Sequence, residues 1–140
     1  MTAVQFLDLL WRSQLADEES LQEFLNLPDY AEQLATEMVD AGVLTQWQAD
    51  KLLAGKWKGF VFDDYTLLRH LRKTAISQEY LAEHSGTKHK VVLTIAPPKL
   101  VDEPDFLERF RRESGNGQLR HFDTIYYLVR DYREGNERVE

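Results

Sequence analysis

The sequence predicts an α+β protein in which a small N-terminal helical bundle precedes a twisted antiparallel sheet that carries one short helix. Three features support this prediction. Apolar residues recur at helical spacing in the first part of the chain, alternate with polar residues in the second part, and return to helical spacing in one stretch, 106–110. We therefore predict a helical domain at residues 1–57, a sheet domain at 58–135 and a charged tail at 136–140.

The helical domain is predicted from capping signals as well as from apolar spacing. Thr45 and Gln48 have the N-cap and N3 spacing of a capping box, as do Asp29 and Glu32, so each pair predicts the start of a helix. The acidic run 17–19 indicates a further start, because carboxylates are favourable at helix N-termini. The predicted apolar faces and glycine stops are Phe6, Leu9, Leu10, Leu21, Phe24, Leu25, Leu34, Met38, Leu52, Gly42 and Gly55.

The sheet domain is predicted from runs of alternating residues separated by turn signals. Ser85, Gly86 and Thr87 are typical of a hairpin turn. Pro104 fits the first position of a helix, where a missing N–H costs little, and the stretch 114–117 predicts the end of that helix. The predicted strands are residues 60–68, 78–84, 88–96 and 121–132.

The formal net charge of −7 is unevenly distributed along the chain. Residues 1–50 contain ten acidic side chains and one basic side chain, Arg12. Such a surface repels phosphate backbones, so nucleic-acid binding is disfavoured. The helices on either side of Gly42 could suggest a DNA-binding helix-turn-helix, but the second one offers only Lys51 as a basic contact. The acidic surface favours a basic partner, or the basic second half of the chain itself.

Several classes of site are disfavoured by composition. The chain has no cysteine, which removes thiolate chemistry and Cys-based zinc sites. It has no apolar run near the length of a membrane span and no signal-peptide layout, so we expect a cytoplasmic protein without membrane contact. The histidines are too dispersed to predict a metal site. They are His70, His84, His89 and His121.

The second half contains a set of motifs in a fixed order: Tyr65, Leu67 and Leu68, then the runs 80–84 (Tyr-Leu-Ala-Glu-His), 104–113 and 126–132. Together these motifs resemble those of the N-lobe of eukaryotic-like bacterial serine/threonine kinases. The stretch from Leu44 to Phe60 also resembles the helical lead-in found before some of these kinase domains. The resemblance covers about residues 43–135 and implies a five-stranded kinase-type sheet with one helix.

The positions that hold ATP in that family carry other residues in this chain. The resemblance places Arg72, Thr74 and Ser77 at the three glycines of the phosphate loop, where only glycine permits close backbone approach. Thr94 replaces the phosphate-binding lysine, and Glu113 occupies the position of its glutamate partner. The remaining departures are Glu79 at the adenine roof, Val92 beside it and Arg130 at the back wall.

These departures predict a specific rearrangement of the former nucleotide site. The family's fold implies that Glu113 and the fifth strand lie in one neighbourhood. We therefore expect Arg130, together with Glu79, to replace the missing lysine and to fill the cleft with an internal charge network. An unpaired glutamate against the adenine position would be costly to desolvate, so ATP binding is not expected.

The sequence therefore predicts a non-catalytic protein-interaction or regulatory module with no catalytic residues, no cofactor and no metal. No His-Arg-Asp or Asp-Phe-Gly motif follows Tyr132, so phosphoryl transfer is not expected. We expect a protein partner, either a related kinase or a second copy of this chain. Two alternatives remain open: a small-molecule sensor with a remodelled cleft, and a kinase fragment without an independent role.

Overall fold

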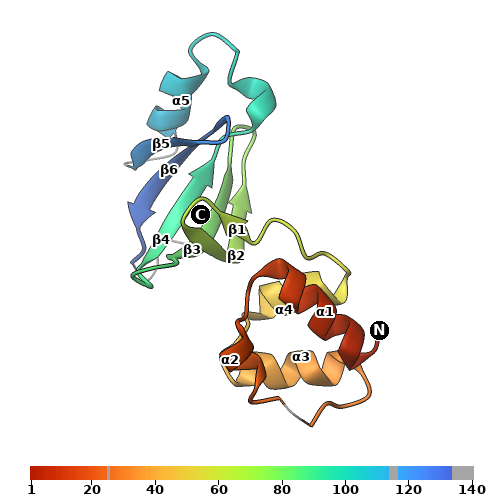
Figure 1. Ribbon diagram of the computed structural model, residues 1–140. Helices are drawn as coiled ribbons and strands as arrows, with labels where there is room; N and C mark the ends of the chain where they lie inside the picture. The colour runs from red at the N-terminus through yellow and green to blue at the C-terminus, as the bar shows by residue number, and fades with distance from the viewer. Residues whose placement is uncertain (25, 114–116, 134–140) are drawn as a thin grey trace. The chain divides into compact units, whose positions relative to one another are not determined.

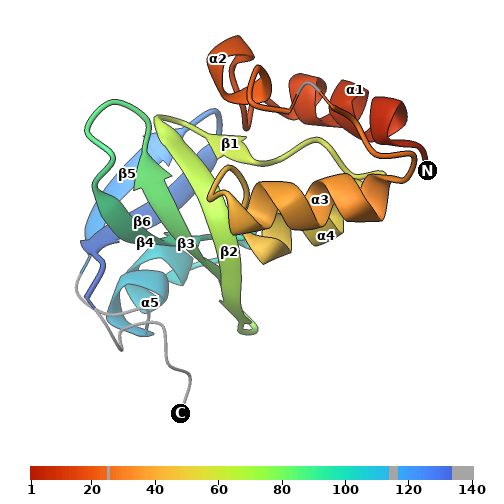
Figure 2. The ribbon, with the colours of Figure 1, turned by 90° about the horizontal axis from the view of Figure 1, so that it is seen from below.

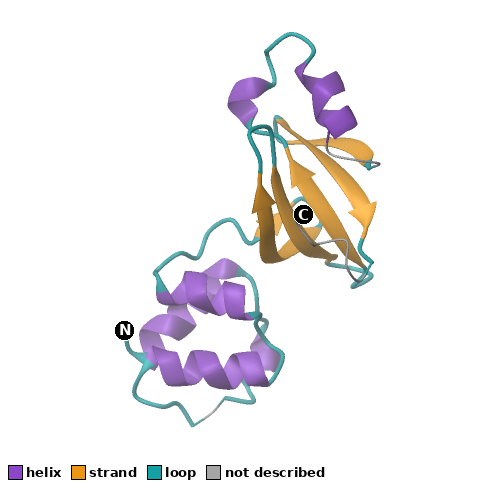
Figure 3. Cartoon of the chain, turned by 180° about the vertical axis from the view of Figure 1, so that it is seen from behind, coloured by secondary structure: helices purple, strands orange, loops and turns teal. Residues whose placement is uncertain are grey.

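The computed structural model describes residues 1–24, 26–113 and 117–133 (Figure 1). The chain divides into two compact units, Met1–Phe62 and Asp63–Glu140. The first is helical and the second is built on an antiparallel sheet with one α-helix, which confirms the predicted α+β class (Figure 3). The unit boundary lies after residue 62, whereas the sequence placed it after 57. The difference arises because Phe60 is buried in the core of the helical unit.

The described residues of the helical unit form four helices: α1 (Ala3–Ser13), α2 (Glu18–Leu21), α3 (Ala31–Asp40) and α4 (Gln46–Leu53). Each of the three longer helices contributes one apolar face to a common core. The unit therefore has a hydrophobic core of its own. The side chains with no exposed surface in this core include those of Phe6, Leu10, Leu34, Met38 and Leu52.

The helix starts confirm one capping box, correct another and reveal a third. Thr45 and Gln48 form the predicted box at α4. The box expected from Asp29 and Glu32 is wrong, because Tyr30 is the N-cap of α3 and makes no side-chain cap hydrogen bond. Backbone pairing with the N-terminal segment fixes this start instead. The unpredicted third box, Thr2 with Gln5, opens α1.

Most other helix signals were correct where the structure describes them, but Phe24, which was assigned to an apolar helix face, lies beyond the end of α2 at Leu21. The Asp17 side chain accepts from the Ser20 backbone N–H at the start of α2. Gly42 and Gly55 have left-handed φ values of 79° and 82°, which end α3 and α4 as predicted. Leu25, which was assigned to an apolar helix face, lies outside the described residues.

The described part of the sheet unit contains the strands β2, β3, β4, β6 and β5, in that order across the sheet. The pairs from β2 to β5 are antiparallel. Figure 2 shows the sheet curling from β2 round to β5. Along the described chain, the strands are β1 (Val61–Phe62), β2 (Tyr65–Lys73), β3 (Gln78–His84), β4 (Lys90–Ile95), β5 (Gln118–Phe122) and β6 (Ile125–Asp131).

The last predicted strand, 121–132, is a hairpin of β5 and β6. The chain reverses at Asp123 and Thr124, whose φ values are 46° and 67°. Two consecutive positive φ values are typical of the tight turns that match strand twist. The turn was missed because Asp-Thr lacks the usual glycine. The hairpin between β3 and β4 has the predicted turn, with Lys88 N–H bonded to the His84 carbonyl.

The helix of the sheet unit, α5 (Phe106–Glu113), follows a short 3₁₀ turn at Pro98–Leu100. The prediction that Pro104 is the first residue of α5 is wrong, because Asp105 lies between Pro104 and the helix with a left-handed φ of 61°. Phe106 and Phe110 are buried on the sheet beside Ile76, Ala96 and Leu128. Of the predicted stop at 114–117, residues 114–116 lie outside the described residues, as does the predicted tail at 136–140.

Candidate functional site

The strand register brings five of the eight predicted site positions onto one face of the sheet. Glu79 on β3 is paired with Arg72 on β2 and with Thr94 on β4. Two residues along β4, Val92 is paired with Arg130 on β6. Directly paired residues, and residues two apart on one strand, point to the same side of a sheet. These five side chains therefore form one continuous group across four strands.

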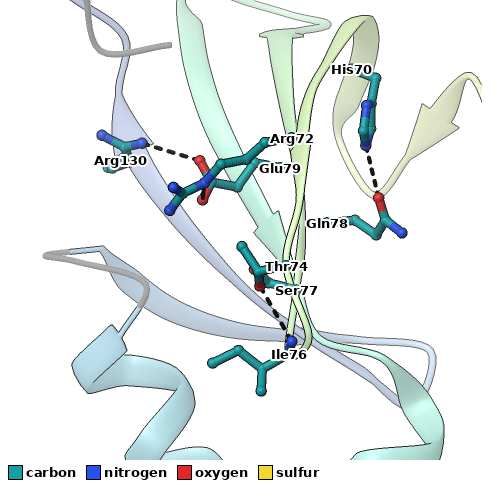
Figure 4. Close-up of polar contacts among 8 residues, drawn as sticks. All are labelled: His70, Arg72, Thr74, Ile76, Ser77, Gln78, Glu79 and Arg130. Carbon is teal, nitrogen blue, oxygen red and sulfur yellow. Dashed lines mark hydrogen bonds and ion pairs between the residues drawn. The ribbon is translucent and has the colours of Figure 1, made fainter. Parts of the chain in front are cut away.

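Glu79 is the centre of the charge network on this face. Its side chain is only 6% exposed. One carboxylate oxygen lies 2.8 Å from Arg72 Nε, and the other lies 3.5 Å from Arg130 Nη2 (Figure 4). Both arginines are partly exposed, so their charges remain in contact with water. A carboxylate with so little solvent is stabilised by two cationic partners, because water no longer supplies that stabilisation.

The structure differs from the expected network in the partner of Glu113. Glu113 pairs with Arg109, whose Nε lies 3.2 Å from Glu113 Oε2, and both side chains are about half exposed. Among the described residues, Arg130 pairs with Glu79 instead. Arg109 and Glu113 are four residues apart on α5, a spacing that brings side chains together on a helix surface. This spacing was the sequence signal that could have identified Arg109.

Thr74 and Ser77 close the turn between β2 and β3 through their side chains. Their hydroxyl oxygens lie 2.8 Å apart, and Thr74 Oγ1 also accepts the Ile76 backbone N–H at 3.2 Å (Figure 4). The Thr74 N–H donates to the Ser77 carbonyl at 2.9 Å. Side-chain hydroxyls thus occupy hydrogen-bonding positions at this turn, whereas a glycine loop would present backbone N–H groups to a phosphate.

A hollow of about 220 Å³ lies between this turn and α5. It brings Glu113 together with three of the predicted site residues and adds Arg109, which sequence reasoning missed. Its walls combine two guanidinium groups, one carboxylate and the Ile76 side chain, so it presents both charged and apolar surface. The full lining is Arg72, Thr74, Ala75, Ile76, Ser77, Arg109 and Glu113.

Two buried polar atoms on the sheet face lack a hydrogen-bond partner within the described part of the chain. They are Thr94 Oγ1 and Arg130 Nε. Thr94 is 1% exposed, at the position where the kinase resemblance implies a lysine. A buried hydroxyl without a partner is unfavourable, and native proteins contain few of them. Its position beside Glu79 gives this face additional unsatisfied polarity without adding charge.

A second polar group, absent from the sequence predictions, joins distant parts of the curled sheet. The buried Tyr127 hydroxyl on β6 donates a hydrogen bond to the Asp63 carboxylate. Arg120 on β5 donates to the Tyr65 hydroxyl on β2 at 2.9 Å, although these strands are not neighbours in the sheet order. Burial, reinforced by the Asp63 hydrogen bond, raises the pKa of Tyr127. The group therefore stabilises the curl.

Residues 1–24, 26–113 and 117–133 contain neither a metal-binding cluster nor a membrane-spanning helix. No group of three or more His, Cys, Asp or Glu side chains there could hold a metal ion. No helix in the same residues is long and apolar enough to cross a bilayer.

The comparisons with known proteins identify similarity to bacterial kinase domains. No known protein family matches the sequence, and no curated protein gives a significant match. The structure is similar to that of the PknI kinase domain of Mycobacterium tuberculosis, with 26% identity and a TM-score of 0.41 over 53% of this chain. A mutant of that domain gives 26% identity and a TM-score of 0.43 over 55%. The chain spans about a third of these kinase domains, 35% and 36%.

Proposed function

We propose that this chain is a non-catalytic protein-interaction or regulatory module that resembles a kinase N-lobe and neither binds ATP nor transfers phosphoryl groups. The observation that carries the proposal is the buried Glu79 carboxylate, held by Arg72 at 2.8 Å and by Arg130 at 3.5 Å. The sequence resemblance places Glu79 at the adenine roof and Arg130 at the back wall. An internal ion-pair network then stands where a kinase offers apolar surface to adenine.

The energetic argument concerns the displacement of this network. An adenine ring that entered between Glu79 and Arg130 would separate charges that stabilise each other. Removing one partner from a buried ion pair costs about 3–5 kcal/mol, which corresponds to more than about a hundredfold in affinity. Water can solvate the partly exposed arginines after separation, which lowers their share of this cost. Glu79 is only 6% exposed, so the cost of leaving its carboxylate unpaired remains.

At the phosphate end of the site, the nearby arginines are already paired with carboxylates of the chain. Thr94 is buried and uncharged where the resemblance implies the lysine that pairs the phosphates. Arg72 Nε is engaged with Glu79, and Arg109 Nε with Glu113. Both cations are therefore already neutralised by carboxylates of the chain, which weakens their attraction for a triphosphate.

Titration calorimetry and thermal shift with ATP, with and without Mg²⁺, test the proposal. We expect no saturable signal for the unmodified chain, while an active kinase domain serves as the positive control. A saturable, magnesium-dependent shift would overturn it. The triple variant Glu79→Val/Thr94→Lys/Arg130→Met replaces the two charged members of the network by apolar side chains and puts a lysine at position 94. Glu103→Gln is its control for the same change of net charge at an exposed site. Nucleotide binding by the triple variant alone would identify the network as the cause.

The hollow beside α5 favours a second candidate function, a small-molecule sensor. A volume of about 220 Å³ lined by Arg72, Arg109 and Glu113 suits a small ligand that carries an anionic group and a donor. Thermal-shift measurements with small carboxylates and amino acids test it. Binding should be lost in Arg109→Ala and retained in Arg111→Ala, which changes an exposed arginine outside the lining of the hollow.

The partner in the primary proposal is a protein in the cytoplasm, either a related full-length kinase or a second copy of this chain. The acidic first half and the kinase-like sheet unit are the features that support a binding role. Co-purification from the native cell, followed by mass spectrometry, tests this part. Recovery of the chain without any specific partner at native expression level would contradict it.

A further inference from the structure

The helical unit exposes a group of large apolar side chains that its own core does not use. Met1, Val4, Trp11 and Tyr30 are 42%, 67%, 58% and 64% exposed. We call these four residues the α1 patch. A different face of α1, which includes Phe6 and Leu10, packs into the core of the unit. The α1 patch is therefore surface beyond what packing of the unit requires.

Backbone contacts place the two chain segments that carry the α1 patch side by side. Val4 and Trp11 are seven residues apart on α1, so they lie on the same side of the helix, two turns apart. Tyr30 lies beside the start of α1, because it forms a β-bridge with Thr2. The Ala31 N–H donates to the Met1 carbonyl at 3.1 Å, which fixes Met1 at the same end.

Acidic side chains border the α1 patch. Asp8 is four residues after Val4 and three before Trp11, which places it between them on the outer side of α1, and it is well exposed. Asp29 and Glu32, both exposed, flank Tyr30 in the chain. Within residues 1–50 the one basic side chain, Arg12, is paired with Asp8. Asp29 and Glu32 therefore make the border negative beside Tyr30, whereas Arg12 offsets Asp8 beside Trp11.

We infer that the α1 patch docks a basic amphipathic segment of a partner protein. Apolar side chains of that segment cover Val4, Trp11 and Tyr30, while its Lys or Arg residues face the bordering carboxylates. Trp and Tyr are the residues most often found at the energetic centre of interfaces, and complementary charge fixes orientation and speeds association. The inference rests on the proposed role as an interaction module, for which it names the surface and the chemistry of the partner.

Charge decides among the possible occupants. A second copy would bring the same acidic border against the first, and like charges at an interface are unfavourable. Anionic lipid surfaces and nucleic acids are repelled by the ten carboxylates of residues 1–50 for the same reason. A basic segment gains from both the apolar and the charged parts of the surface.

The first test uses defined helical peptides as probes. A Leu/Lys amphipathic peptide of about 18 residues is titrated into the full chain by calorimetry, and a Leu/Glu peptide of the same apolar pattern is the comparator. We expect saturable binding of the Leu/Lys peptide that weakens as salt increases, and no binding of the Leu/Glu peptide. Absence of binding by the Leu/Lys peptide, or equal binding of both peptides, would overturn the inference.

Variants of the chain locate the binding surface. Val4→Ser/Trp11→Ser/Tyr30→Ser should weaken binding of the Leu/Lys peptide by at least about tenfold, since the truncated side chains form its apolar contact. The matched control, Val61→Ser/Phe122→Ser, truncates side chains that are 42% and 40% exposed elsewhere and should leave affinity unchanged. Equal affinity of the patch variant and the unmodified chain contradicts the assignment. Circular dichroism checks that both variants remain folded.

Charge variants test the border of the patch. Asp8→Asn/Asp29→Asn/Glu32→Gln should weaken binding and reduce its salt dependence, because these carboxylates face the peptide's lysines. The control Glu19→Gln/Glu23→Gln/Glu37→Gln removes the same charge from other exposed positions of the unit and should have a smaller effect. Equal effects of the two triples would show general attraction by net charge and overturn a localised site.

The remaining outcomes distinguish other occupants and the two proposals. Concentration-dependent dimerisation that the patch variant abolishes would assign the surface to a second copy. Sedimentation of the chain with anionic vesicles would assign the surface to a membrane. Either result would overturn the inference. Magnesium-dependent ATP binding would overturn the proposed function without changing the peptide result. Peptide affinity that is unaffected by the patch variant would overturn the docking surface while leaving the nucleotide result intact.

Discussion

Arg72 and Glu79 face each other across β2 and β3, with the guanidinium Nε 2.8 Å from the carboxylate oxygen. The carboxylate is buried and the guanidinium is partly exposed, so water reaches the arginine of this pair but hardly reaches the glutamate. Arg130 approaches the other carboxylate oxygen from β6. Stability at this position depends on keeping a buried negative charge compensated.

The order of stability losses on this face follows from that asymmetry. Removing both cations in Arg72→Met/Arg130→Met leaves Glu79 buried without its charged partners and should reduce the free energy of unfolding by about 3–5 kcal/mol. Adding Glu79→Leu to this double variant should recover most of the loss, because an apolar cluster replaces an uncompensated charge. Urea unfolding measures each variant.

The control is Glu83→Gln, on the same strand but not buried, where a change within about 0.5 kcal/mol is expected. A double variant as stable as the unmodified chain would contradict the view that Glu79 requires its arginines. The same conclusion would follow if the triple variant were less stable than the double variant.

The Tyr127 hydroxyl predicts a loss of stability in alkaline solution. Burial and the hydrogen bond to Asp63 raise the pKa of Tyr127 above its ordinary value of about 10. The folded state therefore holds this proton more tightly than the unfolded state. The stabilisation is complete below about pH 10 and is lost as the pH rises through the raised value. Thermal unfolding as a function of pH should show this decline.

Tyr127→Phe removes the hydroxyl and should weaken the fold at neutral pH by about 1–3 kcal/mol, because the partly buried Asp63 loses its donor. Its stability should also fall less between pH 9 and 11, about the range in which unfolded tyrosine ionises. Tyr126→Phe, the neighbour on the strand, is the control. An unchanged alkaline slope in Tyr127→Phe would assign the decline to other groups.

The capping box of α4 predicts a difference between two threonines of the helical unit. Thr45→Ala removes the side chain that accepts the Gln48 N–H at 3.1 Å and should cost about 1 kcal/mol. Thr36→Ala, in the exposed middle of α3, should be neutral or slightly stabilising because alanine is the better helix former. Chemical denaturation compares the two variants. Equal stability of both would show that the cap does not contribute.

The turn between β5 and β6 can be improved by substitution. Thr124 has a left-handed φ of 67°, which is unfavourable for a β-branched residue. Thr124→Gly should therefore stabilise the chain by up to about 1 kcal/mol. Thr87→Gly, at a hairpin-turn position without positive φ, should be neutral or destabilising. A lower melting temperature for Thr124→Gly than for the unmodified chain would contradict the prediction.

Local sequence signals predicted helices and turns where a short stretch of chain decides the structure. The Thr45 capping box, the Gly42 and Gly55 stops and the strand over residues 78–84 were correct for this reason. Errors arose where distant contacts decide. The start of α3 depends on pairing of residues 29–31 with residues 1–3, which no capping pattern in the local sequence reports.

The candidate site shows the same division. The sequence and its resemblance selected Glu79 and Arg130 as members of one charge network, and the register of β3, β4 and β6 confirms that they meet. The partner of Glu113 was assigned to another strand, whereas the nearby Arg109 on the same helix takes that role. Local helix geometry offered a contact at lower entropic cost than a contact across the fold.

The sequence by itself determined the α+β class, the charge imbalance and the residue types at the eight candidate site positions, because periodicity, composition and motif spacing are local properties of the chain. Only the tertiary structure decided which charges pair, that Tyr127 bonds to Asp63 across the curled sheet, and that the segment of Tyr30 lies beside the start of α1. These contacts join residues far apart in sequence, and their positions depend on strand register and helix packing. The sequence does not encode either one locally.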